Sequence, residues 1–133
     1  SFVNSICYSH DLHHIISGSS DATIKIWSAK SADCSNSFKI NCSSSSTDLS
    51  INCVLIRPAT PDEYIVCNSS TIIFIINKDG QIIKSYNNGR QDAGGEFVLA
   101  MMSPKGYWLY PITQDGTMYC LNLNTGIYEH NMK

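Results

Sequence analysis

Ser17-Gly18-Ser19-Ser20-Asp21, followed by Thr23-Ile24-Lys25-Ile26-Trp27, is the stretch that decides the fold of this 133-residue chain. The second segment alternates apolar with polar residues, which is the period of a half-buried β-strand. The apolar residues Ile15 and Ile16 stand before the first segment, and the small polar residues ending at Asp21 favour a tight turn. We therefore predict two antiparallel strands joined by a turn at Asp21.

The same order of short strands and polar turns occurs three times along the chain. Each set contains four strand patterns, and a long polar connection follows each of the first two sets. The predicted strands cover residues 2–8, 14–17, 23–27, 34–39, 51–56, 64–67, 72–76, 81–86, 97–102, 108–112, 118–121 and a last one from 127. Strand sets repeated at a fixed period predict a repeat protein in which each unit packs against its neighbours.

An overlay of the three sets gives the predicted register of the repeat. Ala32, Gly80 and Gly126 are taken as equivalent turn positions, which aligns Thr23 with Thr71 and Thr117 at spacings of 48 and 46 residues. In this register Asp21 matches Ser69 and Asp115, while Trp27 matches Ile75 and Leu121. The first set therefore carries the most complete pattern of an acidic turn and a strand tryptophan.

The run from Ser17 to Trp27 resembles the repeat of the WD-repeat family. This resemblance implies an all-β fold, a partial β-propeller with three four-stranded antiparallel blades at about 1–40, 51–87 and 96–133. The whole chain, 1–133, is then one partial propeller domain from a ring of seven blades. In the family a turn aspartate, a strand tryptophan and a strand hydroxyl form a hydrogen-bonded network. The residues that the resemblance assigns to this bracing role are Asp21, Trp27, Ser17, Ser19 and Asp115.

A narrower resemblance is to the splicing-factor branch of that family. The segments 66–68, 94–98 and 103–106 are similar to it, including parts of the second and third sets that generic WD repeats do not share. It implies a non-enzymatic scaffold of the precatalytic spliceosome, located in the nucleus, whose partners are spliceosomal proteins including the RED protein. The alternative is a WD-repeat adaptor of another complex.

Two long polar connections, 41–50 and 89–96, are the predicted partner-binding segments. Each joins the fourth strand of one set to the first strand of the next, so a propeller places both on one rim with the Asp21 and Asp115 turns. The candidate contact residues are Asn41, Ser44, Asp48, Arg90, Asp92 and Glu96.

Composition disfavours other classes of function. The net charge is −2 and only 15% of residues are charged, and the basic residues Lys39, Arg57, Lys84 and Arg90 are scattered, so a module that contacts RNA is the weaker alternative. The first strands of the three sets carry almost no ionisable residue besides Cys and Tyr, which argues against an enzyme. We expect no catalytic residues, no cofactor, no small-molecule substrate and no membrane span.

Histidines and cysteines are the remaining candidates for a metal site. His10, His13 and His14 crowd one turn with Asp11, but such surface histidines usually face water, and we expect no metal. Four of the six cysteines, Cys7, Cys53, Cys67 and Cys120, stand in strand patterns and are expected to be small buried apolar residues. Three blades also leave outer faces without neighbours, so we expect either self-association through exposed blade faces or a partially open, curved array.

Overall fold

The computed structural model describes residues 2–40, 49–58, 60 and 62–133, and its regular structure consists of three four-stranded antiparallel sheets. In each sheet the strands are neighbours in chain order, so each sheet is a meander. The strands are β1 (Val3–Tyr8), β2 (His14–Ser19), β3 (Thr23–Ser28), β4 (Cys34–Lys39), β5 (Ile51–Ile56), β6 (Glu63–Asn68), β7 (Ile72–Asn77), β8 (Ile82–Asn87), β9 (Phe97–Met102), β10 (Trp108–Thr113), β11 (Met118–Asn122) and β12 (Ile127–Met132).

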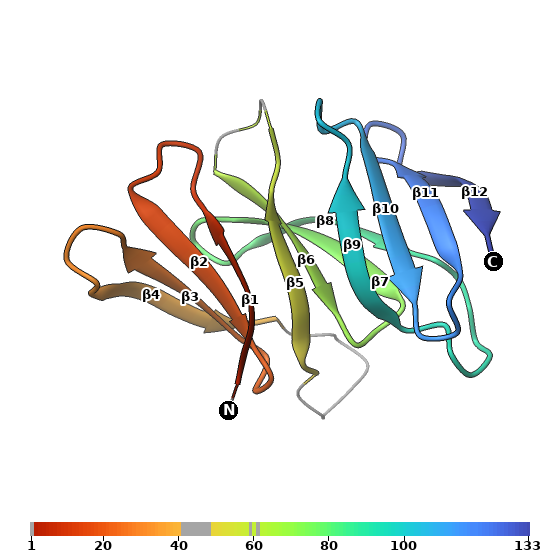
Figure 1. Cartoon of the computed structure of the whole chain (residues 1–133), viewed down its shortest axis with the longest axis horizontal. Helices are drawn as coiled ribbons and strands as arrows, with labels where there is room; N and C mark the ends of the chain where they lie inside the picture. The colour runs from red at the N-terminus through yellow and green to blue at the C-terminus, as the bar shows by residue number, and fades with distance from the viewer. Residues whose placement is uncertain (1, 41–48, 59, 61) are drawn as a thin grey trace.

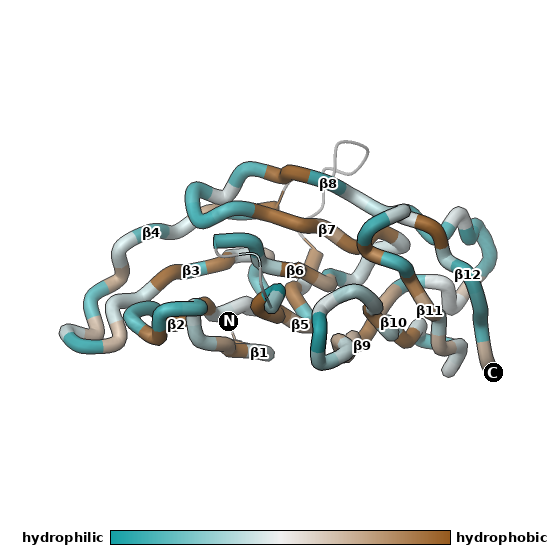
Figure 2. Tube along the Cα trace, turned by 90° about the horizontal axis from the view of Figure 1, so that it is seen from above, coloured by the Kyte–Doolittle hydropathy of each residue, from teal (hydrophilic) through white to brown (hydrophobic). Residues whose placement is uncertain are grey.

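The three sheets are blades that stand side by side along an arc (Figure 1). Seen from above, β1, β5 and β9 lie on the inner side of the arc, while β4 and β8 lie on its outer side (Figure 2). The predicted fold class, an all-β partial propeller with three four-stranded blades, is confirmed. The number of blades in a closed ring stays an expectation from the family resemblance.

Blade two is the central layer, and its two middle strands are buried on both faces. Tyr64, Val66, Phe74 and Ile76 pack into a core shared with blade one. The alternate residues of β6 and β7 pack into a second core with blade three; they are Ile65, Cys67, Ile73 and Ile75. Burial on both faces explains why residues 72–76 are a continuous apolar run rather than an alternating one.

A β-bulge lies near the start of each inner strand, and in β1 and β5 it positions a side chain for contact with the next blade. The pairing of β1 skips Asn4, whose amide donates to the Ile51 carbonyl oxygen at 2.9 Å. The pairing of β5 skips Asn52, whose amide donates to the Phe97 carbonyl oxygen at 3.0 Å. At the same bulge in β9 stands Val98, which has no amide and is 43% exposed. The Asn side chains thus link consecutive blades along the inner side.

On the outer side, an aromatic residue of one blade packs over a turn glycine of the next. A Cβ on Gly80 would lie 2.6 Å from the ring of Phe38, and a Cβ on Gly126 would lie 2.8 Å from the ring of Tyr86. Both glycines have positive φ, at 85° and 75°. A side chain at either glycine would meet both backbone strain and the aromatic ring.

The predicted register of blade two is wrong by one residue. Ile15 pairs with Trp27 and Leu109 with Leu121, and the corresponding pair of blade two is Tyr64 with Ile76. Ile76, not Ile75, therefore occupies the place of Trp27. The turn after β7 closes on Gly80, three residues beyond Asn77, whereas the turns after β3 and β11 close four residues on, at Ala32 and Gly126. The predicted overlay aligned the three blades at Ala32, Gly80 and Gly126, so the shorter turn of blade two shifted its predicted strand positions by one residue.

Exposed apolar side chains gather on the inner strands of the two end blades. They include Ile6 and Tyr8 on β1 and Leu99 and Met101 on β9, all more than 40% exposed. Self-association through these faces stays a prediction. Cys53 and Cys67 are buried, as expected from their strand patterns, while Cys7 and Cys120 are half-buried. Within the described ranges, no helix is long and apolar enough to cross a bilayer.

Candidate protein-binding rim

One end of the blades gathers the turns between second and third strands and the connections between blades. We call this surface the loop rim and define it, among the described residues, by the turns 20–22, 69–71 and 114–117 and the connection 88–96. It forms the lower edge of the molecule in Figure 1. Arg90, Asp92, Glu96, Asp21 and Asp115 all belong to it. Asn41, Ser44 and Asp48, the other candidate contact residues, lie outside the described residues.

The Asp21 turn is closed by hydrogen bonds to its own side chain. Asp21 Oδ1 accepts from the Ser19 hydroxyl at 2.7 Å and from the Thr23 backbone N–H at 3.0 Å. These bonds span the reversal, at which Ala22 has a φ of 71°. The carboxylate thus satisfies two donors at the point where the chain leaves β2 and enters β3.

The other two blades repeat this turn with different chemistry. In blade three, Asp115 Oδ1 accepts from the Thr113 hydroxyl at 2.7 Å and from the Thr117 N–H at 3.1 Å. In blade two, the Ser70 hydroxyl takes the place of the carboxylate and accepts from the Ile72 N–H at 3.1 Å. The predicted equivalent, Ser69, is therefore also one residue off, for the same reason as Ile75.

The tryptophan contact occurs in blade one alone among the three described blades. Trp27 Nε1 donates to the Ser17 hydroxyl at 3.0 Å, and Ser17 is buried. The corresponding pairs are Val66 with Ile76 and Pro111 with Leu121, which have no polar side-chain group. Blades two and three therefore hold this position by apolar packing. How far Asp21, Trp27, Ser17, Ser19 and Asp115 brace the fold energetically stays a prediction.

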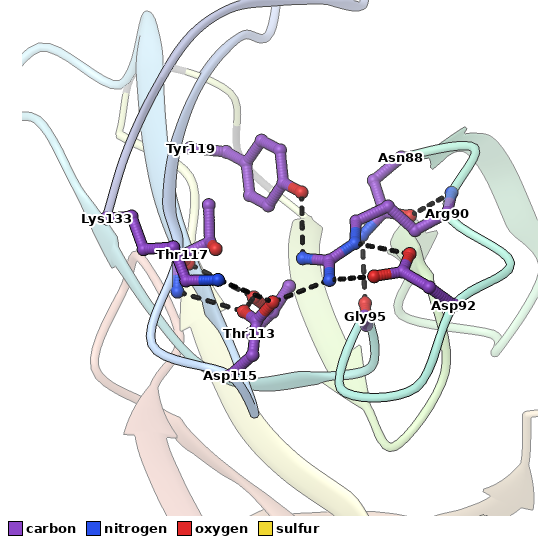
Figure 3. A network of polar contacts seen from close by, with 9 residues as sticks. All are labelled: Asn88, Arg90, Asp92, Gly95, Thr113, Asp115, Thr117, Tyr119 and Lys133. Carbon is purple, nitrogen blue, oxygen red and sulfur yellow. Dashed lines mark hydrogen bonds and ion pairs between the residues drawn. The ribbon is translucent and has the colours of Figure 1, made fainter.

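Arg90 is the centre of the most connected polar cluster on the loop rim (Figure 3). Its guanidinium donates to both Asp92 carboxylate oxygens, at 2.9 and 2.6 Å. Nη2 also reaches Asp115 Oδ2 at 2.5 Å, and Nη1 reaches the Tyr119 hydroxyl at 3.3 Å. We call these four residues the Arg90 cluster. It joins the connection after blade two to the turn and third strand of blade three.

The electrostatics of the Arg90 cluster keep its groups charged. Hydrogen bonds from Arg90, and then from Thr113 and Thr117, hold the pKa of Asp115 well below its usual range. Arg90 likewise lowers the pKa of Asp92, and the two carboxylates raise the pKa of Arg90. At neutral pH the cluster therefore contains one cation and two anions. A second cation, Lys133 Nζ, lies 3.8 Å from Asp115 Oδ2.

Hydrogen bonds within the 88–96 connection and one to blade three hold the rest of the connection in place. Asn88 accepts from the Arg90 N–H at 2.9 Å through its side-chain oxygen and donates to the Gly95 carbonyl oxygen at 3.0 Å. The Asp115 N–H donates to the Gly94 carbonyl oxygen at 3.1 Å. A Cβ on Gly95 would lie 2.8 Å from Arg90 Cβ, so this position has room only for hydrogen. The connection is an ordered surface from which the Asp92 side chain, 66% exposed, projects.

Sequence reasoning selected Arg90, Asp92 and Asp115 for separate reasons, and the structure brings these three together. It missed Tyr119, Asn88 and the two glycines that let the connection approach Arg90 and Asp115. Adjacent Gly94 and Gly95 after an Asn-Asn-Gly turn are a signal of tight backbone packing, but nothing in the sequence names the partner of Arg90. Glu96 contributes its backbone carbonyl, which accepts from the Gln114 N–H at 2.8 Å.

No group of three or more His, Cys, Asp or Glu side chains in the described ranges is placed to hold a metal ion. Burial raises the pKa of the Cys67 and Cys53 thiols and raises that of Cys7 to about 12, so these thiols stay protonated at neutral pH. The chemistry that the loop rim does offer is fixed charge and hydrogen-bonding groups on an ordered surface.

The four-stranded meanders, their arc and the acidic turns define the class of this chain: it is a partial β-propeller whose blades are of WD-repeat type. No protein-family model matches the chain. It is similar to WD40 repeat-containing protein smu1 of Dictyostelium discoideum, with 35% identity over 126 residues. That similarity covers 95% of this chain and 23% of that protein, so the chain spans less than a quarter of the relative it matches.

Proposed function

We propose that the chain is a non-enzymatic, protein-binding part of a scaffold and that the loop rim is its binding surface. The observation that carries this proposal is the Arg90 cluster, which fixes the 88–96 connection against blade three and leaves the Asp92 side chain exposed. A surface that is already ordered loses little conformational entropy when a partner binds, which favours affinity. Long connections on a rigid frame are also where binding residues concentrate.

We further propose that the parent protein is a pre-mRNA splicing factor of the precatalytic spliceosome, acting in the nucleus with spliceosomal proteins that include the RED protein. Two findings support this narrower proposal. One is the resemblance of segments 94–98 and 103–106 to that branch of the WD-repeat proteins. The other is the similarity to WD40 repeat-containing protein smu1 across 95% of the chain. A WD-repeat adaptor of another complex is the alternative.

Direct contact with RNA is less well supported, because both arginines are already engaged and Lys39 and Lys84 are scattered along the sequence. Arg90 is bound by two carboxylates. Arg57 Nη1 lies 3.3 Å from Glu63 Oε1, and the Arg57 side chain is only 13% exposed. Binding through phosphates needs several free cationic groups on one face.

The experiment exchanges residues 89–95 for a short turn in the full-length protein and measures which spliceosomal proteins co-purify with it. We expect reduced co-purification while the thermal unfolding transition remains cooperative. A matched exchange in the turn 104–106, at the opposite end of the blades, should leave co-purification unchanged. Equal co-purification of both variants and the parent protein would contradict the proposal.

A further inference from the structure

A cleft of about 510 Å³ opens between blades one and two at the end of the blades opposite the loop rim. Its walls come from the turn after β1, the start of β4, the end of the connection before β6, and the turn after β7. No part of the proposed loop-rim function uses it. The lining residues that bear on ligand binding include Asp11, Asp62, Asp79, Tyr64, Lys78 and Ile26.

The cleft carries an excess of negative charge. Three carboxylates line it, together with one lysine ammonium and two imidazoles, those of His10 and His14. The Ser9 hydroxyl at 2.6 Å and the His13 N–H at 2.9 Å hold Asp11 in place and lower the pKa of its carboxyl. The carboxylates of Asp62 and Asp79 accept no hydrogen bond and form no ion pair within the described part of the chain. An excess of negative charge attracts a cation and repels phosphate.

Tyr64 adds a hydroxyl that hydrogen-bonds to no described residue, on a side chain that is otherwise buried. The residue is only 3% exposed, lines the cleft, and makes no side-chain hydrogen bond to any described residue. Among the described residues, no fully enclosed side-chain oxygen or nitrogen lacks a partner, so the Tyr64 hydroxyl oxygen keeps some exposure on a residue that lines the cleft. A hydroxyl left in this position is available to hydrogen-bond a ligand.

The next pair of blades shows what fills the corresponding place. The N–H groups of Ser9 and Arg57 both follow an inner strand and donate to the first residue of the next strand, so the two positions are equivalent. Asp79 and Asn124 are equivalent too, since each stands two residues after the last residue of the third strand of its blade. Between blades two and three, Arg57 Nη2 donates to Asn124 Oδ1 at 3.3 Å. The chain's own arginine therefore occupies the interblade space that the small Ser9 leaves open between blades one and two.

We propose that the cleft between blades one and two binds an arginine side chain presented by a basic segment of a partner protein. Asp79 faces the guanidinium from the place that Asn124 has beside Arg57, and Asp62 supplies a carboxylate from the residue before β6. His14 holds the place of Glu63. The Tyr64 hydroxyl accepts one further hydrogen bond. Ile26 and the Tyr64 ring provide an apolar wall for the aliphatic stem. Arginine suits the site better than lysine because its planar fork of five donors can serve several acceptors at once.

The test titrates the chain with acetyl-Gly-Arg-Gly-amide and follows backbone amide shifts by NMR. We expect saturable shifts at residues 9–11, 62–64 and 78–79, no saturation with the citrulline peptide, and at least threefold weaker binding of the lysine peptide. The double variant Asp62→Asn/Asp79→Asn should bind at least about threefold more weakly, since two charge contacts at exposed carboxylates are lost. The proposal would be overturned if the arginine and citrulline peptides had equal effects, or if shifts occurred only at other residues. Equal binding of the lysine and arginine peptides would overturn the assignment to arginine.

Two further variants separate cleft binding from general attraction to an acidic protein. Ser9→Arg should fill the cleft as Arg57 fills its neighbour and abolish the shifts, while Ser103→Arg, at the equivalent position of blade three, should leave them in place. The charge-matched control Glu96→Gln/Glu129→Gln should bind like the parent chain. Unchanged binding by folded Ser9→Arg, or equal weakening by the control pair, would show that the peptide does not occupy this cleft.

Discussion

At the residue scale, the contact between Trp27 and Ser17 is a polar brace that blade one has and the other two blades lack. Trp27→Phe removes the indole N–H, so the buried Ser17 hydroxyl loses the hydrogen bond that it accepts from Trp27. We expect a loss of about 1–2 kcal/mol in the free energy of unfolding, measured by urea denaturation. Ser17→Ala combined with Trp27→Phe should cost less than the sum of the two single changes, because no orphaned group remains. Additive losses would show that the bond contributes nothing.

Asp115 gives a residue-scale prediction for pH. Its folded-state pKa lies below the unfolded value of about 3.9, so its stabilising contribution is present above pH 4 and is lost as pH falls below 4. Asp115→Asn should therefore be less stable than the parent chain at pH 6, and the difference should shrink steadily between pH 4 and pH 2. Urea denaturation across this range measures it. A difference that is independent of pH would contradict the assigned contact with Arg90.

The separate residues of the rim were predictable from the sequence, but their contacts were not. An aspartate between two strand patterns predicts a turn wherever it occurs, since the hydrogen bonds that it accepts come from residues two positions away. The bond between Arg90 and Asp115 joins residues 25 positions apart, and it depends on how blade three docks on blade two. No periodicity encodes that docking.

At the element scale, the 88–96 connection keeps its place because Gly94 and Gly95 let the backbone come close to Asp115 and Arg90. Gly94 and Gly89 both have positive φ, at 89° and 77°, but a Cβ on Gly94 would lie 2.9 Å from Asp115 Cβ, while one on Gly89 would meet nothing within 4 Å. Alanine at either site costs similar backbone strain. Gly94→Ala should cost about 1–3 kcal/mol more than Gly89→Ala in the free energy of unfolding, because it also overpacks Asp115. Equal costs would mean that the connection does not lie against blade three.

The strands themselves were predicted well, because each is defined by a local alternating or apolar pattern bounded by turn residues. The register of blade two was predicted wrongly, because the turn after β7 is one residue shorter than its equivalents. Every strand position that is aligned through this turn is therefore shifted by one residue. Ile76 and Ser70 instead of Ile75 and Ser69 are the result. Strand pairing, which the sequence does not display, was needed to find the shift.

At the scale of the whole molecule, the blades are coupled by the Asn side chains on the inner strands. Asn52 donates to Ser69 Oγ and to the Phe97 carbonyl oxygen, both at 3.0 Å, and so ties blade two to blade three. Asn52→Ala should lower the free energy of unfolding by about 1–2 kcal/mol and speed amide hydrogen exchange in β9. The exposed Asn131 on β12 gives the control, since Asn131→Ala should change neither quantity. If β9 exchanged at the parent rate in Asn52→Ala, the bond would have no role in blade coupling.

The arrangement of blades also separates two surfaces, the loop rim at one end and the acidic cleft at the other. Photo-crosslinking in the full-length protein tests most directly which end meets the partners that define its function. A benzophenone amino acid is placed at Asp92 on the loop rim or at Tyr107, which is 53% exposed in the turn at the opposite end. The account predicts crosslinks to spliceosomal proteins from position 92 and few from position 107, which lies on blade three and does not line the cleft between blades one and two. Crosslinks from position 107 with none from position 92 would contradict it.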